Sequence, residues 1–164
     1  MSTTLQRIAY SPLWLLLYAV ALLPFGALYA LSDALAWVAA SVVRYRRRLV
    51  EANIAAAFPD KTEAERRDIV KRFYRNFTDV FVETIKLLHI SDDEMRRRMV
   101  FEDIEHVERI AKDGRSIGLY CSHFGNWEWI TSITLWVYRA DNVEYSQVYR
   151  PLRNKWFDRF WFNL

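Results

Sequence analysis

The most apolar part of the chain lies close to its N-terminus. Residues 13–31 read LWLLLYAVALLPFGALYAL, a run of 19 residues without a charged side chain. A helix of about 20 apolar residues is long enough to cross the hydrocarbon core of a bilayer. Trp14, Tyr18 and Tyr29 stand toward the ends of the run, where aromatic belts form. The pattern predicts a membrane helix over 13–31, kinked at Pro24, with a buried core helix or a cleaved signal peptide as the alternatives.

The apolar pattern continues to Val43, so this helix either runs on or lies in the membrane interface. It ends at a cluster of arginines, namely Arg44, Arg46, Arg47 and Arg48. Beside a membrane segment, such a cluster is expected to meet anionic headgroups, although a solvated helix face is the simpler alternative. Because the cluster outweighs Arg7, the positive-inside rule places the residues after it in the cytoplasm. We therefore expect residues 1–45 to form a membrane anchor and a juxtamembrane segment.

The middle of the chain has helical periodicity. Pro59 ends one helix, since proline disfavours helical geometry in the residue before it. Thr62 and Glu65 have the spacing of a capping box that opens the next helix. That helix is predicted to extend to about His89, and its apolar stripe is expected to face a core rather than form a ligand groove. The stripe consists of Ile69, Phe73, Phe77, Val80, Phe81, Thr84 and Leu88.

A different pattern follows Gly114. Residues 117–121 (IGLYC) form a short apolar run typical of a buried strand, and residues 127–138 have helical spacing after Asn126, a favourable N-cap. Residues 143–149 (VEYSQVY) alternate like a second strand. A strand–helix–strand unit places its strands parallel, with a right-handed crossover. The predicted fold class is therefore α/β: a membrane helix and a helical segment, followed by the start of a parallel-sheet domain over residues 46–164.

This topology suggests where a site would lie. Ligands of open parallel sheets bind beyond the carboxyl ends of the strands. His123 follows the first predicted strand and Arg150 follows the second, so both are expected to face one crevice.

The segment HFGNWE holds a possible acid–base pair. His123 and Glu128 are five residues apart, and Gly125 between them allows a tight turn. A carboxylate bonded to one imidazole nitrogen would fix the tautomer and support protonation of the other. Exposed backbone N–H groups of the following helix could stabilise an anion. The alternative is a structural histidine capped by a nearby carboxylate.

Composition narrows the other possibilities. The chain is 52% hydrophobic and carries a net charge of only +3, which does not favour a nucleic-acid partner. A single cysteine, Cys121, excludes an intramolecular disulfide framework. Cys121 as a nucleophile with His123 is an alternative chemistry, but residues two apart in a strand lie about 6–7 Å from one another. A zinc site from these two residues and Glu128 is a weaker alternative still, since the spacing fits no usual ligand pattern.

Three motifs now occur in an order that resembles a known family. HFGNWE resembles the H-x4-[D/E] motif of glycerolipid acyltransferases, and more closely that of the late acyltransferases of lipid A biosynthesis, the lauroyl and myristoyl transferases. The other two motifs are EANIAAAFPDKTEAER at residues 51–66 and a Tyr-Arg-Pro stretch at residues 149–154. Members of that family continue well past this point, so the resemblance implies an N-terminal fragment of a glycerolipid-acyltransferase-like domain.

The resemblance implies catalysis by His123 as general base, oriented by Glu128, and substrate binding by Arg150, Asn126 and Gly125. It implies no metal or bound cofactor, with acyl carrier protein or acyl-CoA as the acyl donor. The expected acceptor is a membrane lipid, with a lipid A precursor favoured over a lysophospholipid or an aminolipid. The expected location is the cytoplasmic side of the bacterial inner membrane. A non-catalytic membrane-anchored fragment or pseudoenzyme is the remaining alternative.

Overall fold

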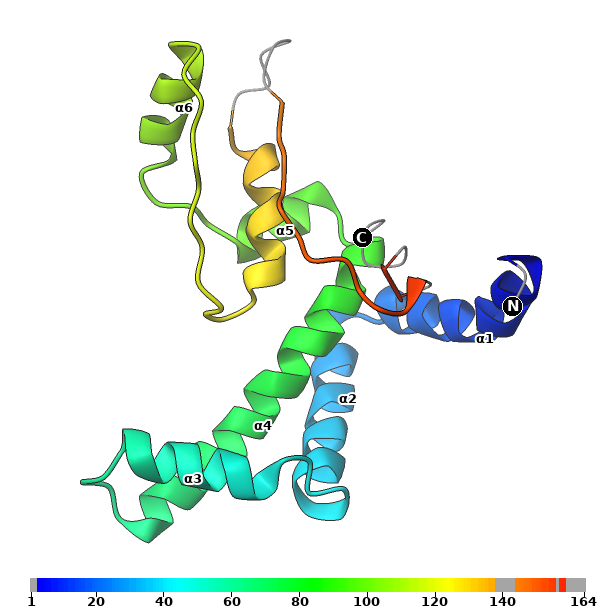
Figure 1. The fold of residues 1–164 in the computed structure, drawn as a ribbon, viewed down its shortest axis with the longest axis vertical. Coiled ribbons are helices and arrows are strands. Elements are labelled where there is room, and N and C mark those ends of the chain that lie inside the picture. Colours follow the sequence, from blue (N-terminus) through cyan, green and yellow to red (C-terminus); the bar gives the residue numbers. More distant parts are fainter. Residues whose placement is uncertain (1–2, 138–143, 156, 159–164) are drawn as a thin grey trace. The chain divides into compact units, whose positions relative to one another are not determined.

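The computed structural model describes residues 3–137, 144–155 and 157–158, and every regular element in them is a helix (Figure 1). The α-helices are α1 (Thr3–Leu22), α2 (Phe25–Trp37), α3 (Arg47–Ala57), α4 (Glu63–Lys86), α5 (Asp92–Arg98) and α6 (Ile104–Lys112). A π-helix, η1 (Val38–Val42), and two 3-10 helices, η2 (Leu87–His89) and η3 (Trp127–Leu135), are also present. The chain divides into two compact units. We call Ala19–Lys86 the α2–α4 unit, and Met1–Tyr18 with Leu87–Leu164 the motif unit.

The predicted α/β fold class is wrong for this structure. Residues 115–122 and 144–152 have no regular secondary structure, and the helix expected over 127–138 is the 3-10 helix η3. Parallel strands are stable when helices cover both faces of their sheet, and an isolated pair of strands is marginal. Here Leu119 is 54% exposed and Tyr120 is 99% exposed, so nothing buries the first predicted strand. The strand–helix–strand unit is not formed in the described residues.

The N-terminal apolar run is divided between two helices. α1 ends at Leu22 and α2 begins at Phe25, so the kink predicted at Pro24 is a complete break. The helical stretch long and apolar enough to cross a membrane is Phe25–Val42, which joins α2 to η1, and Pro12–Leu22 is a shorter apolar helix. The single helix predicted over 13–31 is therefore wrong in its bounds.

The core of the α2–α4 unit lies where α2 and α3 pack against α4 (Figure 1). Ala36 of α2, Val50 and Ile54 of α3, and Tyr74 of α4 form its buried cluster. The Tyr74 hydroxyl donates to the Tyr45 carbonyl oxygen at 2.7 Å, which satisfies the one polar atom of this large side chain.

The start of α4 confirms the predicted capping box. The Glu65 N–H donates to the Thr62 hydroxyl at 3.3 Å, and the Thr62 N–H donates to the Glu65 carboxylate at 2.8 Å. Each bond satisfies a backbone donor that the helix itself leaves without an acceptor. The end of α3 at Ala57, two residues before Pro59, also agrees with the sequence.

The buried face of α4 agrees with the predicted stripe only in part, since Ile69 packs against the core cluster and Thr84 is buried. Tyr74, Thr78 and Val82 are buried, whereas Phe73 is 41% exposed and Phe81 is 51% exposed. The prediction that these two phenylalanines face the core is wrong. Tyr74 and Thr78 carry polar atoms that find acceptors inside the unit, so the buried face is partly polar and apolar periodicity does not reveal it.

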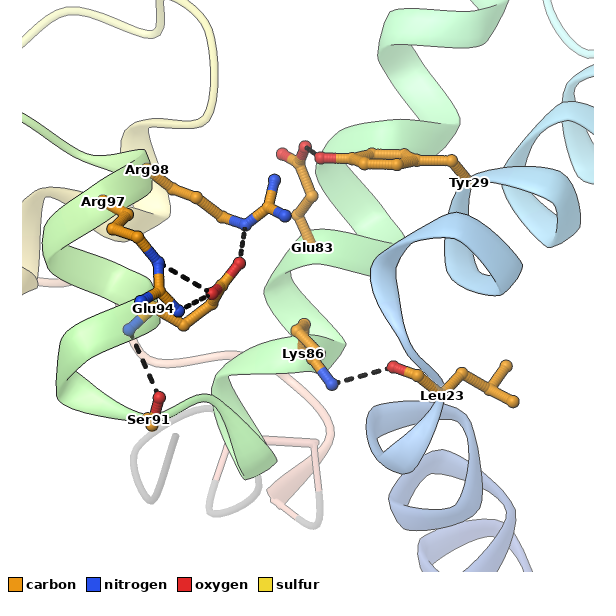
Figure 2. A network of polar contacts seen from close by, with 8 residues as sticks. All are labelled: Leu23, Tyr29, Glu83, Lys86, Ser91, Glu94, Arg97 and Arg98. Atoms are coloured by element: carbon orange, nitrogen blue, oxygen red, sulfur yellow. Dashed lines mark hydrogen bonds and ion pairs between the residues drawn. The ribbon is translucent and has the colours of Figure 1, made fainter.

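Polar pairs join α2 to α4 along their contact. The Ser32 hydroxyl donates to the Asp79 carboxylate at 2.6 Å, and the Tyr29 hydroxyl donates to Glu83 at 2.7 Å (Figure 2). α2 therefore turns its hydroxyl groups toward α4.

A buried lysine at the end of α4 binds the backbone at the break between α1 and α2. The Lys86 ammonium group donates to the carbonyl oxygens of Ala21 at 2.7 Å and Leu23 at 2.8 Å (Figure 2). These carbonyls lie at the break before Pro24, where a helix end leaves acceptors without intrahelical donors. Lys86 is 7% exposed, so its charge is stabilised largely by this geometry.

In the motif unit, α5 is capped at its N-terminus by Ser91 and carries ion pairs between its own side chains. The Glu94 N–H donates to the Ser91 hydroxyl at 3.2 Å, and Arg97 and Arg98 both donate to the Glu94 carboxylate (Figure 2). Hydrogen bonds from Arg97 first and Arg98 second lower the pKa of Glu94. The basic residues also complement the dipole at the end of this short helix.

Candidate functional site

The predicted catalytic histidine lies in an exposed bend just before η3. Gly125 has a φ of 58°, a left-handed conformation that glycine adopts without strain, and it turns the chain from the bend into the helix. The Phe124 N–H donates to the Ser122 carbonyl oxygen at 2.9 Å, which tightens the backbone around His123. The imidazole lies at the surface of the motif unit.

The His123 ring contacts Trp127, the first residue of η3. The two ring centroids are 4.8 Å apart and the planes meet at 60°, an edge-to-face arrangement. Sequence reasoning did not single out Trp127. The signal was present in the motif itself, because the turn at Gly125 brings a residue four positions after the histidine back against its ring.

Asn126 and Glu128 lie on either side of Trp127. Asn126 occupies the N-cap position of η3, as predicted, but its side chain makes no capping hydrogen bond there. The backbone carbonyl oxygen of Asn126 instead accepts a hydrogen bond from the Trp129 N–H at 3.3 Å. Glu128 is half-buried in the first turn of η3, and within the described residues no hydrogen bond joins it to His123. The acid–base roles of His123 and Glu128 stay predictions.

The helix that follows the motif is anchored to α5. Trp129 and Ser132 are buried, and the Trp136 ring packs against Phe101 at 6.5 Å between centroids. The Arg96 guanidinium lies 5.4 Å from the centre of the same indole, a cation–π contact. These contacts give the exposed bend a packed support.

Arg150 lies in the exposed, irregular segment 144–152. Within the described part of the chain it forms no hydrogen bond or ion pair with His123 or Glu128. The crevice inferred from parallel strand ends is not supported, since those strands are not formed. Its substrate-binding role now rests on the motif alone.

Alternative chemistries at the motif gain no geometric support. Cys121 is an exposed free thiol two residues before His123. Among the described residues no group of three or more His, Cys, Asp or Glu side chains could hold a metal ion.

The sequence motifs have counterparts among known proteins. The model of the bacterial lipid A biosynthesis acyltransferase family matches residues 2–164. The chain belongs to this family. It is 23% identical over 157 residues, 93% of its length, to the lipid A biosynthesis acyltransferase of Haemophilus influenzae, and it covers 48% of that protein. It is 28% identical over 126 residues, 75% of its length, to the lipid A biosynthesis lauroyltransferase of Escherichia coli, covering 41%.

Family membership confirms the resemblance inferred from the three motifs. The chain spans about half the length of the curated relatives it matches, so the activity, substrates and partners of a whole protein remain to be proposed for it. No solved structure matches the chain.

Proposed function

We propose that this chain carries the motif region of a membrane-associated acyltransferase that moves a fatty acyl chain from a thioester to a hydroxyl of a lipid A precursor. The observation that carries the proposal is the family match over residues 2–164, combined with an exposed His123 in the family's H-x4-E motif. Acyl carrier protein and acyl-CoA are the thioester donors that the family chemistry requires, and no bound cofactor takes part.

His123 acts as the general base. Its free imidazole nitrogen takes the proton of the acceptor hydroxyl as the oxygen attacks the thioester carbonyl. The tetrahedral oxyanion then collapses, the C–S bond breaks, and the thiolate leaves and takes up the proton from the imidazolium. Backbone N–H groups at the start of η3 are suited to stabilise the oxyanion, with Gly125 keeping the approach open.

Glu128 supports the imidazolium in this scheme. It lies in the first turn of η3, one residue after the indole that packs on His123, and in this proposal its carboxylate bonds to the imidazole once a substrate is bound. Catalytic hydrogen bonds are often long in free enzymes and tighten in the substrate complex. Arg150 and Asn126 bind the substrate, Arg150 through a phosphate that its guanidinium fork matches.

The membrane is the site of action. An anchor within residues 1–45 holds the catalytic residues, which belong to a domain that starts at residue 46, on the cytoplasmic side of the inner membrane. Support for membrane association comes from the apolar helical stretch Phe25–Val42 and from the arginines that follow it, which are expected to meet anionic headgroups.

The test is transfer of a labelled acyl group from acyl carrier protein to a lipid A precursor by the membrane-reconstituted chain. We expect transfer that is abolished by His123→Ala and largely kept by Cys121→Ala. Loss of transfer in Cys121→Ala together with a trapped acyl-enzyme would establish the thiol as nucleophile instead. Absence of transfer, or transfer equal in wild type and His123→Ala, would make the chain a non-catalytic member of the family. Lysophospholipid and aminolipid acceptors tested in parallel decide the acceptor class.

A further inference from the structure

The α2–α4 unit carries a concentrated positive surface where η1 meets α3. We call residues Arg44–Arg48 the arginine turn. Arg44 and Arg46 have φ values of 52° and 49°, so the backbone turns sharply at both. An open cavity of about 630 Å³ is lined by Arg44, Arg46, Arg47 and Arg48, together with Leu49 and Glu51. Its walls are therefore mostly guanidinium groups and their aliphatic stems.

Most of this charge has no partner inside the protein. Arg47 pairs with Glu51 at 2.8 Å and donates to the Ala40 carbonyl oxygen at 3.3 Å. The side chains of Arg44, Arg46 and Arg48 make no hydrogen bond or ion pair within the described part of the chain. Three guanidinium groups thus converge on one small surface with their donors available to an anion.

An exposed aromatic surface begins at the same turn. Tyr45 stacks on Phe77 with centroids 5.7 Å apart, and Phe77 contacts Phe73 at 6.0 Å and Phe81 at 5.0 Å. We call these four residues the aromatic row. Its members Phe73, Phe81 and Tyr45 are 41%, 51% and 47% exposed. Because Tyr45 stands between two of the free arginines, apolar rings and positive charge form one continuous surface.

The contact between α2 and α4 restricts how this unit can meet a membrane. The hydroxyls of Ser32 and Tyr29 donate to Asp79 and Glu83 of α4, so α4 lies along α2. If α2 crossed the bilayer in this arrangement, the charged residues of α4 would enter the hydrocarbon core beside it. Charged side chains at that depth are costly. A surface location leaves them in water and lets the aromatic row enter the interface.

We propose that the α2–α4 unit docks on the surface of an anionic phospholipid bilayer through the arginine turn and the aromatic row, and lies in the interface without crossing it. Charge complementarity indicates that the partner is an anionic bilayer. The unpaired arginines match the lipid phosphates, and the exposed rings beside them match the acyl chains below. The aromatic row inserts at the headgroup level, and the guanidinium groups bind lipid phosphates. This docking surface belongs to the α2–α4 unit and is separate from the His123 motif.

The experiment measures depth at two neighbouring positions of α4 in the whole chain. In a Cys121→Ser background, Phe81→Cys and Asn76→Cys are labelled separately with an environment-sensitive fluorophore. Asn76 is exposed and is offset from Phe77 by about 100° around the helix, which makes it a matched control. The chain is reconstituted with vesicles of phosphatidylglycerol and phosphatidylcholine, and quenching by aqueous iodide is compared with quenching by lipids brominated deep in the acyl chain.

With anionic vesicles, the label at position 81 should be blue-shifted and protected from iodide, while the label at position 76 stays accessible. The triple variant Arg44→Gln, Arg46→Gln and Arg48→Gln should lower the ratio of docked to undocked protein about a hundredfold, or about fivefold for each arginine. The control triple Arg67→Gln, Lys71→Gln and Arg72→Gln removes the same charge elsewhere and should leave the ratio nearly unchanged. Vesicles of phosphatidylcholine alone should reproduce the loss seen in the first triple.

Three outcomes would overturn the proposal. Equal iodide access at position 81 with and without vesicles would mean that the aromatic row does not meet lipid. Quenching of both labels by the deep bromolipid would mean that α4 enters the bilayer beside a spanning α2. Protection at position 81 that rises with protein concentration in the absence of vesicles would assign the surface to a second copy of the chain. No acyl donor is present, so these outcomes are independent of whether the chain transfers acyl groups.

Discussion

The imidazole ring of His123 lies edge-on against the indole ring of Trp127, with centroids 4.8 Å apart. The contact joins the exposed bend to the first residue of η3, whose later residues pack against α5. It restricts rotation of the imidazole, which would otherwise be free at the surface. A restricted base needs less ordering when a substrate binds, and this reduces the entropic part of the barrier.

Replacing Trp127 by leucine should release the His123 ring. An aromatic pair contributes about 0.5–1.5 kcal/mol, so we expect kcat to fall about two- to tenfold while KM changes little. Trp127→Phe should recover most of the loss because it keeps an edge-to-face contact. The NMR shift of the His123 ring protons checks the geometry directly, since loss of the indole ring current moves it in Trp127→Leu. An unmoved resonance would contradict the contact.

Arg150→Ala should weaken binding of a phosphorylated substrate. A charge-assisted contact is worth about 1.5–3 kcal/mol, so KM should rise roughly tenfold to a hundredfold. Arg150→Lys should recover only part of it, since a point charge does not reproduce a bidentate fork. A fall in kcat alone would instead place the guanidinium on the developing oxyanion. Kinetics unchanged in both variants would remove Arg150 from the site.

Lys86→Met should destabilise the α2–α4 unit. The substitution keeps the length of the side chain but leaves the buried carbonyls of Ala21 and Leu23 without this donor, and hydrogen bonds from a charged donor contribute about 1.5–3 kcal/mol each to stability. We therefore expect a clear fall in the midpoint of thermal unfolding, measured by circular dichroism in detergent micelles. Lys71→Met, at an exposed position of the same helix, should change the midpoint little. Equal midpoints in the two variants would show that Lys86 does not stabilise the break.

The capping box makes the start of α4 sensitive to acid. Hydrogen bonds from the Thr62 backbone first, then from Lys61 and the Thr62 hydroxyl, lower the pKa of Glu65 to about 2. A carboxyl group whose pKa is depressed in the folded state stabilises the fold above its unfolded value of about 4.3, and that contribution is lost as the pH falls through about 2. An NMR titration of the Glu65 carboxyl should show this low midpoint. Thr62→Ala should raise it only in part, because the backbone donor remains.

The sequence predicts features that depend on residues close together in the chain, and it misses features that depend on residues far apart. Thr62 and Glu65 are three residues apart, and Pro59 acts on its immediate neighbour, so both helix boundaries could be predicted from local chemistry. The exposed Phe73 and Phe81 could not, because the face that α4 buries is decided by hydrogen bonds to Ser32 and Tyr45, far away in the chain. Periodicity identifies apolar positions but not the partner that selects among them.

The candidate site shows the same division. The motif located His123 and the turn at Gly125, whose positive φ the structure contains. The strands predicted on either side of the motif are not formed. A short apolar run forms a stable strand only when neighbouring strands pair with it and helices cover it. The position of Arg150 depended on those strands and so could not be derived from spacing.

The polar contact between α2 and α4 has a consequence for biosynthesis. Ser32 and its partner Thr78 are 46 residues apart, so α2 is made before the side chains that bind it. At ribosomal speed that interval lasts about 2 to 9 seconds. During this interval the hydroxyl groups of Tyr29 and Ser32 on α2 lack their acceptors on α4. In the proposed docking, α4 therefore holds α2 at the bilayer surface only after this interval has passed.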